Sequence, residues 1–265
     1  MIQHIVTLYY PPTEEAKKVY EQMKSEGQRL YFINAGSLKD SDDEWVKKNC
    51  ALETSKKENI ATRNENMCEM TSLYFVWKNL LDGFSDDDWV QHSHYRKMIE
   101  HREIDLSEKL YSGYVVTPIH MIFNVGEEGQ RKPIQTDIEG GTNICHPKWT
   151  WNAMEEVLLD NLNWRDSQAW CEWKRLRVMP APLNLFMLKK PLFKEYCEWV
   201  FPLIFDIDKK IPYDREEYKT AYQRRAISFV GERLFSFWCY MKTTYGVLFQ
   251  CSPVKIYDGF KPITD

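Results

Sequence analysis

The chain begins with hydrophobic positions that switch between strand-like and helix-like spacing. Residues 2–10 are rich in β-branched and aromatic side chains and stop at two prolines, which indicates a buried strand. Thr13 stands before two glutamates and an amphipathic stretch that reaches about residue 25, which predicts a capped helix. Residues 29–34 predict a second strand, and it runs into Asn34-Ala35-Gly36. This order predicts a βαβ unit with parallel strands, and such sheets bind ligands at the carboxyl ends of their strands.

The middle of the chain continues with shorter elements. Residues 41–54 favour a helical stretch, and residues 69–81 carry apolar side chains on one face of a predicted helix. Residues 89–92 and 113–122 are typical of strands. Residues 125–141 are polar and rich in glycine, so we expect a long loop or lid there.

The second half of the chain is dominated by helical spacing. Pro202 is expected to interrupt one of these helices, and residues 249–265 predict a strand followed by a tail. The predicted helices cover residues 152–162, 167–177, 191–209 and 216–240. The chain is therefore predicted to be one α/β domain, a sheet flanked by helices. Residues 1–122 would form a nucleotide-binding half, and residues 123–265 a mostly helical acceptor-side half.

The composition of the chain limits the classes of function and the cellular compartment that can be expected. A chain of 265 residues with 43% hydrophobic content can bury a core without disulfides or metals. The net charge of −4 argues against general binding to a nucleic-acid backbone. Seven cysteines without a C-x-x-C pair favour free thiols in a reducing compartment. Without a signal peptide or a run of about 20 apolar residues, the protein is expected to be cytoplasmic.

Several motifs resemble, in the same order, those of a bacterial glycosyltransferase family of capsule and lipopolysaccharide synthesis. That family was long catalogued as a domain of unknown function. The resemblance covers nearly the whole chain, although residues 126–163 match poorly and Tyr9-Tyr10 stands where the family has His-Lys. The motifs are the run of residues 59–71, which contains Asn59, Asn64 and Cys68-Glu69-Met70-Thr71, then Trp77-Lys78-Asn79, His94-Tyr95-Arg96-Lys97, Asn184-Leu185-Phe186-Met187, Tyr222-Gln223 and Glu232-Arg233-Leu234.

The resemblance implies a GT-A-like fold and the transfer of a hexose or pentose from a nucleotide sugar, most simply a UDP-sugar. The acceptor would be a hydroxyl of a polysaccharide repeat, which can be lipid-linked. The donor would be bound by Tyr9, Asn34, Ala35, Gly36, Asn59, Asn64, Glu69, His94, Tyr95 and Arg96, and the acceptor side would contain Asn184, Met187, Gln223, Arg225 and Arg233.

The donor diphosphate needs a positive partner, and two solutions compete. Asp86-Asp87-Asp88 precedes a predicted strand, away from the ligand-binding edge, so we interpret it as a solvated loop. Arg96 follows that strand, and a guanidinium matches phosphate geometry without any metal or other cofactor. The alternative is a divalent ion, Mn or Mg, held by His92 and His94, although imidazoles without a carboxylate suit Mn or Zn better than Mg.

Two acids are candidates for the chemistry. Glu69 at a helix start either complements the helix dipole or, by the resemblance, binds hydroxyls of the donor. Glu232 lies on an apolar helix and is either a structural partner of Arg233, Arg225 or Arg224, or the general base that deprotonates the acceptor. An arginine partner would keep Glu232 ionised.

Two other functions remain open from the sequence. A transferase that modifies bases of viral DNA would suit the aromatic excess and a groove lined by Lys174, Arg175 and Arg177, but the net charge argues against it. A non-enzymatic nucleotide- or sugar-binding module would bind without turnover, and it gives no joint role to Arg96 and Glu232.

Overall fold

The computed structural model describes residues 1–34, 42–56, 58–94, 97–99, 110–125 and 132–256. Within these residues, nine strands form one mixed sheet, with the main order β12-β6-β11-β4-β1-β2-β3. β5 pairs with β4, and β13 pairs with β5. The strands are β1 (Ile2–Leu8), β2 (Arg29–Asn34), β3 (Cys50–Leu52), β4 (Trp89–His94), β5 (Lys97–Ile99), β6 (Gly113–Val116), β11 (Phe186–Lys189), β12 (Phe249–Ser252) and β13 (Val254–Ile256).

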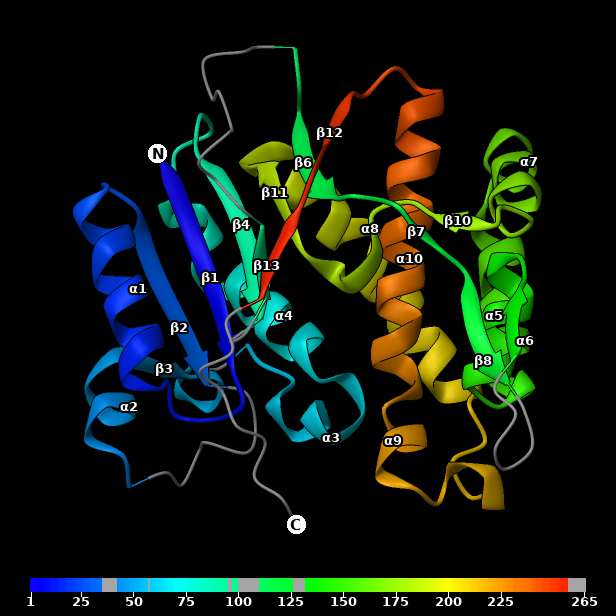
Figure 1. Cartoon of the computed structure of the whole chain (residues 1–265), viewed down its shortest axis with the longest axis horizontal. Coiled ribbons are helices and arrows are strands. Elements are labelled where there is room, and N and C mark those ends of the chain that lie inside the picture. Colours follow the sequence, from blue (N-terminus) through cyan, green and yellow to red (C-terminus); the bar gives the residue numbers. More distant parts are fainter. Residues whose placement is uncertain (35–41, 57, 95–96, 100–109, 126–131, 257–265) are drawn as a thin grey trace.

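The βαβ unit at the beginning of the chain is confirmed. Thr13 caps α1 (Glu14–Ser25), because its hydroxyl accepts a hydrogen bond from the amide of Ala16 at 3.3 Å. β1 is parallel to β2 on one side and to β4 on the other. The carboxyl ends of these three strands therefore share one edge of the sheet, near the bottom of Figure 1.

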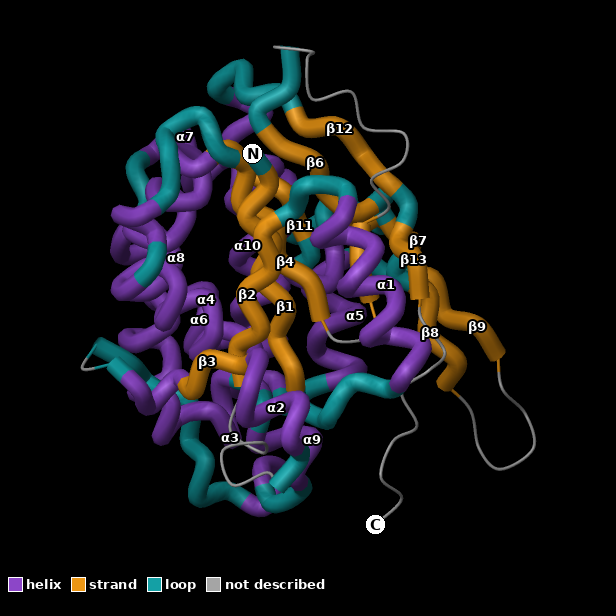
Figure 2. The backbone as a smooth tube through the Cα atoms, turned by 90° about the vertical axis from the view of Figure 1, so that its left-hand side faces the viewer, coloured by secondary structure: helices purple, strands orange, loops and turns teal. Residues whose placement is uncertain are grey.

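Helices cover both faces of the sheet (Figures 1 and 2). On one face, α1 and α2 (Glu44–Asn49) pack on Val6, Leu8 and Phe32. On the other face lie α4 (Glu69–Asn79), α8 (Lys190–Lys210) and α10 (Ala226–Thr244). The α/β class, with a sheet flanked by helices and a mostly helical C-terminal half, is confirmed.

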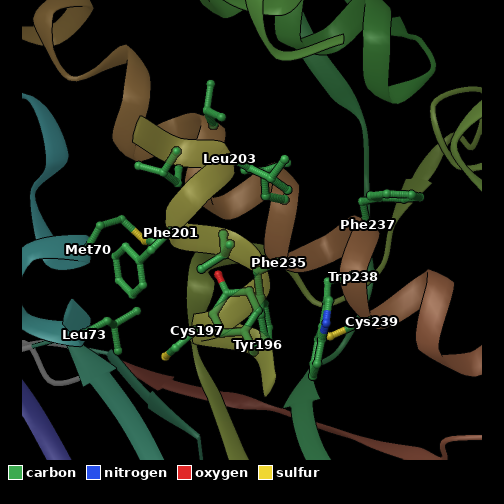
Figure 3. Close-up of a cluster of buried hydrophobic side chains, with 14 of the residues drawn as sticks. Met70, Leu73, Tyr196, Cys197, Phe201, Leu203, Phe235, Phe237, Trp238 and Cys239 are labelled. Atoms are coloured by element: carbon green, nitrogen blue, oxygen red, sulfur yellow. The ribbon is translucent and has the colours of Figure 1, made fainter. Parts of the chain in front are cut away.

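Much of the aromatic content lies in the core between α8, α10 and the sheet (Figure 3). The rings of Tyr196 and Phe235 are 5.1 Å apart at an interplanar angle of 75°, and those of Tyr196 and Trp238 are 5.2 Å apart. Such edge-to-face pairs add stability beyond the apolar area they bury. α10 is therefore firmly packed, and a side chain on its open face is held at a fixed position.

The remaining elements surround this core. The helices are α3 (Asn64–Met67), α5 (Ile138–Cys145), α6 (Lys148–Asn161), α7 (Trp164–Trp173) and α9 (Ala221–Arg224), with short 3₁₀ turns η2 (Glu53–Ser55), η3 (Ala61–Arg63), η4 (Leu81–Gly83), η5 (Pro182–Asn184) and η6 (Glu216–Tyr218). Two small sheets pair β7 (Ile119–His120) with β10 (Val178–Met179) and β8 (Ile122–Val125) with β9 (Lys132–Gln135). No helix of the described residues is both long and apolar enough to cross a membrane.

Three expectations about elements were wrong. α8 runs unbroken through Pro202, which lies on its exposed face, where water can reach the carbonyl that loses its partner. The expected loop at residues 125–141 contains β9 and the start of α5, where Asp137 caps the helix by accepting from Gly140 N at 2.8 Å. The expected strand 113–122 is divided between β6, β7 and β8.

Candidate functional site

A cavity of about 390 Å³ opens at the carboxyl edge of the parallel strands. Tyr9 and Tyr10 reach it directly after β1, and His94 reaches it from the end of β4. α10 closes the opposite side, so both halves of the chain contribute to the wall. The lining residues are Tyr9, Tyr10, Asn64, Glu65, Cys68, Glu69, His94, Lys97, Leu183, Arg225, Ser228, Phe229 and Glu232.

Glu69, the first residue of α4, places a buried carboxyl on the cavity floor. The side chain is satisfied by hydroxyls from two distant elements: Ser228 donates to Oε2 at 3.2 Å, and Tyr9 at 3.4 Å. Burial raises the pKa of Glu69 above its ordinary value, while its hydrogen bonds oppose that effect. A carboxyl held in this way is oriented before any ligand arrives.

A polar network below the floor supports Glu69. Asn184 is fully buried, its Nδ2 donates to Met70 Sδ at 3.3 Å, and its side chain lowers the pKa of the neighbouring Glu69. The carbonyl of Asn184 accepts from His92 Nδ1 at 2.8 Å, so His92 Nε2 is left to accept from Thr7 Oγ1 at 3.1 Å. Burial lowers the pKa of His92 to about 3, and the ring is therefore neutral. Both ring nitrogens are thus engaged within the protein, which argues against His92 as a metal ligand.

Glu232 faces the same cavity from α10. Arg225, Phe229 and Glu232 are spaced by four and three residues, which places them on one face of the helix. The Glu232 side chain is 16% exposed, and its Oε2 lies 3.2 Å from Arg233 Nη1. The predicted pairing with Arg233 is therefore confirmed.

The charge state expected for Glu232 is not borne out. Burial raises its pKa to about 7, and Glu69 raises it further, although Arg233, Lys97 and Arg225 lower it. Desolvation outweighs the arginine partner because Arg233 also forms hydrogen bonds with Phe229 O and Thr142 Oγ1. A carboxyl with this pKa can exchange protons near neutral pH.

Two cations complement the acids. Lys97 at the start of β5 and Arg225 at the start of α10 both line the cavity. The Arg225 guanidinium lies 5.6 Å and 5.8 Å from the ring centroids of Tyr222 and Phe229. Each cation acts on Glu232 electrostatically without being in direct contact with it. The cavity therefore combines Glu232, which can exchange protons, and the Glu69 carboxyl with positive groups that suit an anion.

The structure brings six of the predicted site residues to this cavity and leaves others outside its wall. Asn59 closes a turn through its contacts with Lys56 O and Ala61 N. Met187 is fully buried with Trp89 and Tyr114, because it points to the opposite face of the sheet from its neighbour Phe186. Those at the cavity are Tyr9, Asn64, Glu69, His94, Arg225 and Glu232.

Three further predicted residues lie behind the wall. Asn184 and Arg233 lie beside Glu69 and Glu232, as described above. Gln223 is bound to His146 Nδ1 at 3.2 Å and to Cys145 O at 3.0 Å. Asn34 ends β2, and the predicted residues that fall outside the described part of the chain are Ala35, Gly36, Tyr95 and Arg96.

The sequence also held signals for lining residues that we had not predicted. Ser228 lies four residues before Glu232 on α10, a spacing that places both on one helix face. Cys68 belongs to the same motif as Glu69, and Lys97 follows Arg96, which it was expected to help in neutralising the diphosphate. Leu183 could not be predicted in this way, since it comes from the turn η5, which is far from the other lining residues in the sequence.

Asp86-Asp87-Asp88 lies at the amino end of β4, the edge opposite the cavity, as expected. Asp86 and Asp87 are exposed, but Asp88 is buried and accepts from Gln3 Nε2 at 2.7 Å and Ser85 N at 2.9 Å. Asp88 is thus a turn residue rather than a solvated one. Within the described ranges, no group of three or more His, Cys, Asp or Glu side chains is placed to hold a metal ion.

Comparisons with known proteins show that the chain is similar to a protein family and to a solved structure. The model of a family described as a domain of unknown function, DUF4422, matches residues 17–243. The apo structure of WbbM, a bifunctional glycosyltransferase, superimposes with a TM-score of 0.70 at 16% identity. The match covers 100% of this chain but 48% of that one, so the chain spans about half the length of WbbM, and the likeness is one of fold. No curated protein matches the chain in sequence.

Proposed function

The chain belongs to the DUF4422 family, and from this membership together with the cavity we propose that it is a glycosyltransferase that uses a nucleotide sugar. The observation that carries the proposal is the pairing of a buried carboxyl, Glu69, and a partly buried one, Glu232, with two cations, Lys97 and Arg225, in one cavity. The cavity lies where α/β sheets bind their ligands. The glycosyltransferase fold of WbbM supports the same assignment.

In the proposed reaction, Glu232 in its ionised form accepts the proton of an acceptor hydroxyl. The hydroxyl oxygen then bonds to the anomeric carbon of the donor sugar, and the bond from that carbon to the diphosphate oxygen breaks. The nucleoside diphosphate departs with the bonding electrons, so its growing negative charge needs nearby cations. Lys97, Arg225 and the neighbouring Arg96 of the sequence motif are proposed to supply them, and no metal is needed in this scheme.

Glu69 is proposed to bind hydroxyls of the donor sugar or ribose. Its carboxyl already has partners in Ser228 and Tyr9. Glu69 lines the cavity from the start of α4, whereas Glu232 lines it from α10. The finer identity of the substrates rests on the family resemblance. We propose a UDP-sugar as donor and a saccharide hydroxyl of a growing polysaccharide as acceptor, with a GT-A type of donor binding.

The alternative acceptor, a base of viral DNA, was suggested by a possible groove lined by Lys174, Arg175 and Arg177. The Lys174 ammonium lies 2.5 Å from a Glu155 oxygen, and the Arg175 guanidinium lies 3.2 Å from Asp137. Two of the three cations expected in the groove are thus paired with acids of the same chain, which weakens the case for phosphate binding there. A binding module without catalysis would leave the raised pKa of Glu232 without a use.

A thermal-shift screen tests the proposal. Wild-type protein is scanned with UDP, UDP-glucose, UDP-galactose and the corresponding nucleosides. A ligand present at 100 times its Kd stabilises by about 2.7 kcal/mol, which is a shift of about 5–10 °C for a chain of this size. We expect the nucleotide sugars to raise the melting temperature more than uridine does, and nucleotide release in the presence of saccharide acceptors to follow. If no nucleotide or nucleotide sugar shifts the melting temperature, the proposed function is wrong.

A further inference from the structure

The floor of the cavity is built from backbone conformations that side chains rarely adopt. Among the described residues, the non-glycine residues with positive φ are Cys68, Ala181, Leu183 and Asn184. Cys68 and Leu183 line the cavity, and Asn184 is a neighbour of Glu69. Such conformations cost free energy and persist only where the surroundings enforce them, most often at functional sites.

Cys68 is the most informative of these residues. Its φ of 44° and ψ of −125° match the first central position of a type II′ turn, which is dominated by glycine. The turn joins α3 to α4 and directly precedes Glu69. The conformation of Cys68 therefore sets the direction in which the Glu69 side chain leaves the backbone.

Hydrogen bonds hold this turn in place. The carbonyl of Cys68 accepts from Thr71 Oγ1 at 2.8 Å, from Thr71 N at 3.1 Å and from Asn64 Nδ2 at 3.1 Å. The amide of Cys68 donates to Asn64 O at 2.9 Å. Because these bonds use backbone atoms of Cys68, they would be equally available to a glycine. They explain how the conformation survives, but they do not explain why the position carries a side chain.

The thiol supplies that reason. It lies next to Ser228 and Arg225, two lining residues of α10. Ser228 in turn donates to Glu69 Oε2 at 3.2 Å. Burial raises the pKa of the thiol to about 12, so it stays protonated and is no nucleophile. Its contacts connect α10 to the turn that carries Glu69.

We propose that Cys68 is a positioning residue: its side chain is retained at a glycine-type backbone position because it aligns Ser228 and Arg225 with the Glu69 carboxyl. The consequence for substrate binding rests on the proposed function. The consequence for stability does not, so the two can be tested separately.

The stability test compares two buried cysteines. Cys239, which is labelled in Figure 3, lies within α10. Its side chain is 3% exposed, against 6% for Cys68. At Cys239, alanine should give a higher melting temperature than glycine, as in any helix interior. At Cys68 we expect the reverse order, with Cys68→Gly melting about 2 °C or more above Cys68→Ala, because glycine relieves the strained φ. The same order at both positions would overturn the inference.

The positioning test uses affinity for UDP-glucose, measured by calorimetry. Cys68→Ala and Cys68→Gly should each weaken binding at least tenfold, although the second is the more stable of the two. Cys68→Ser, whose hydroxyl can replace the thiol as a hydrogen-bonding group, should stay within about threefold of wild type, as should Cys239→Ala. Wild-type affinity in Cys68→Gly would show that the side chain positions nothing.

A third experiment separates this inference from the proposed function. If the wild-type protein binds no nucleotide or nucleotide sugar, the proposed function fails, and a double-mutant cycle on melting temperature decides the positioning role. Cys68→Ala combined with Glu69→Gln should be non-additive, whereas Cys68→Ala combined with Cys239→Ala should be additive. Additive effects in the first pair would refute the positioning role.

Discussion

Replacing Glu232 by glutamine should change how the stability of the protein depends on pH. Gln is close in shape to Glu and can still accept a hydrogen bond from Arg233, but it carries no ionisable group. The difference in unfolding free energy between Glu232→Gln and wild type therefore isolates the titration of Glu232 and its coupling to Glu69. Every other ionisable group is common to the two proteins.

The magnitude follows from the pKa. Burial raises the pKa of Glu232 from 4.5 to about 7, and one unit corresponds to 1.36 kcal/mol, so the full effect is about 3 kcal/mol. A carboxyl with a raised pKa holds its proton more tightly in the folded state than in the unfolded one. Wild type therefore loses this stability as pH rises from about 4 to 8, and Glu232→Gln does not. Relative to wild type, the variant should gain about 3 kcal/mol over that range, or about 6–12 °C.

The assay is a series of denaturant or thermal unfolding curves at half-unit steps from pH 4 to pH 8. Glu198→Gln is the matched control, because Glu198 is an exposed partner of Lys194 in an i, i+4 pair that is worth about 0.3–0.5 kcal/mol. Its difference from wild type is measured at the same pH values as a reference. A difference for Glu232→Gln that does not change with pH would show that Arg233 keeps Glu232 ionised, and our account of its burial would be refuted.

The same variant tests catalysis, since loss of a general base should lower turnover about 10²–10⁴-fold with donor affinity nearly unchanged. Wild-type turnover should rise with pH through about 7, as the carboxyl loses its proton.

Two further predictions concern other residues. Arg96→Ala should weaken donor binding about 10–100-fold with little change in melting temperature. EDTA should leave wild-type turnover largely intact. Turnover that is abolished by EDTA and restored by Mn would contradict the proposal that Arg96 takes the place of a metal ion. Asp208→Asn should destabilise the fold by about 1–3 kcal/mol in urea unfolding, because its buried carboxylate contacts Arg63 and accepts from Tyr213 at 2.7 Å, whereas the exposed Asp206→Asn should cost little. Equal effects of these two substitutions would show that the buried contacts of Asp208 add nothing.

Local patterns predicted the elements well where local physics decides them. The cap at Thr13 and the strand at residues 29–34 were confirmed because hydroxyl capping and β-branched runs act over a few residues. Pro202 and Asp88 were misjudged because exposure, which the sequence does not give, decides whether a proline breaks a helix or an acid needs a partner.

The candidate site was predictable in part, for a related reason. Glu232 could be selected because an acid within an apolar pattern is unusual, and Glu69 because it begins a predicted helix within a motif of the family resemblance. Their meeting in one cavity depends on contacts such as that between Ser228 and Glu69, which are 159 residues apart. The protonation of Glu232 depends on desolvation by the assembled fold, which no spacing in the sequence reveals.

The strand order of the sheet has a consequence for synthesis on the ribosome. β6 is joined to the rest of the sheet through β11, which lies between it and β4, and its other neighbour, β12, comes still later in the chain. β11 is made about 70 residues after β6, which takes roughly 4–14 s at 5–20 residues per second. During that interval the β4 edge lacks its main-chain partner and β6 has no strand to pair with. The nascent chain therefore presents two segments with unpaired backbone N–H and C=O groups to chaperones and to other nascent chains.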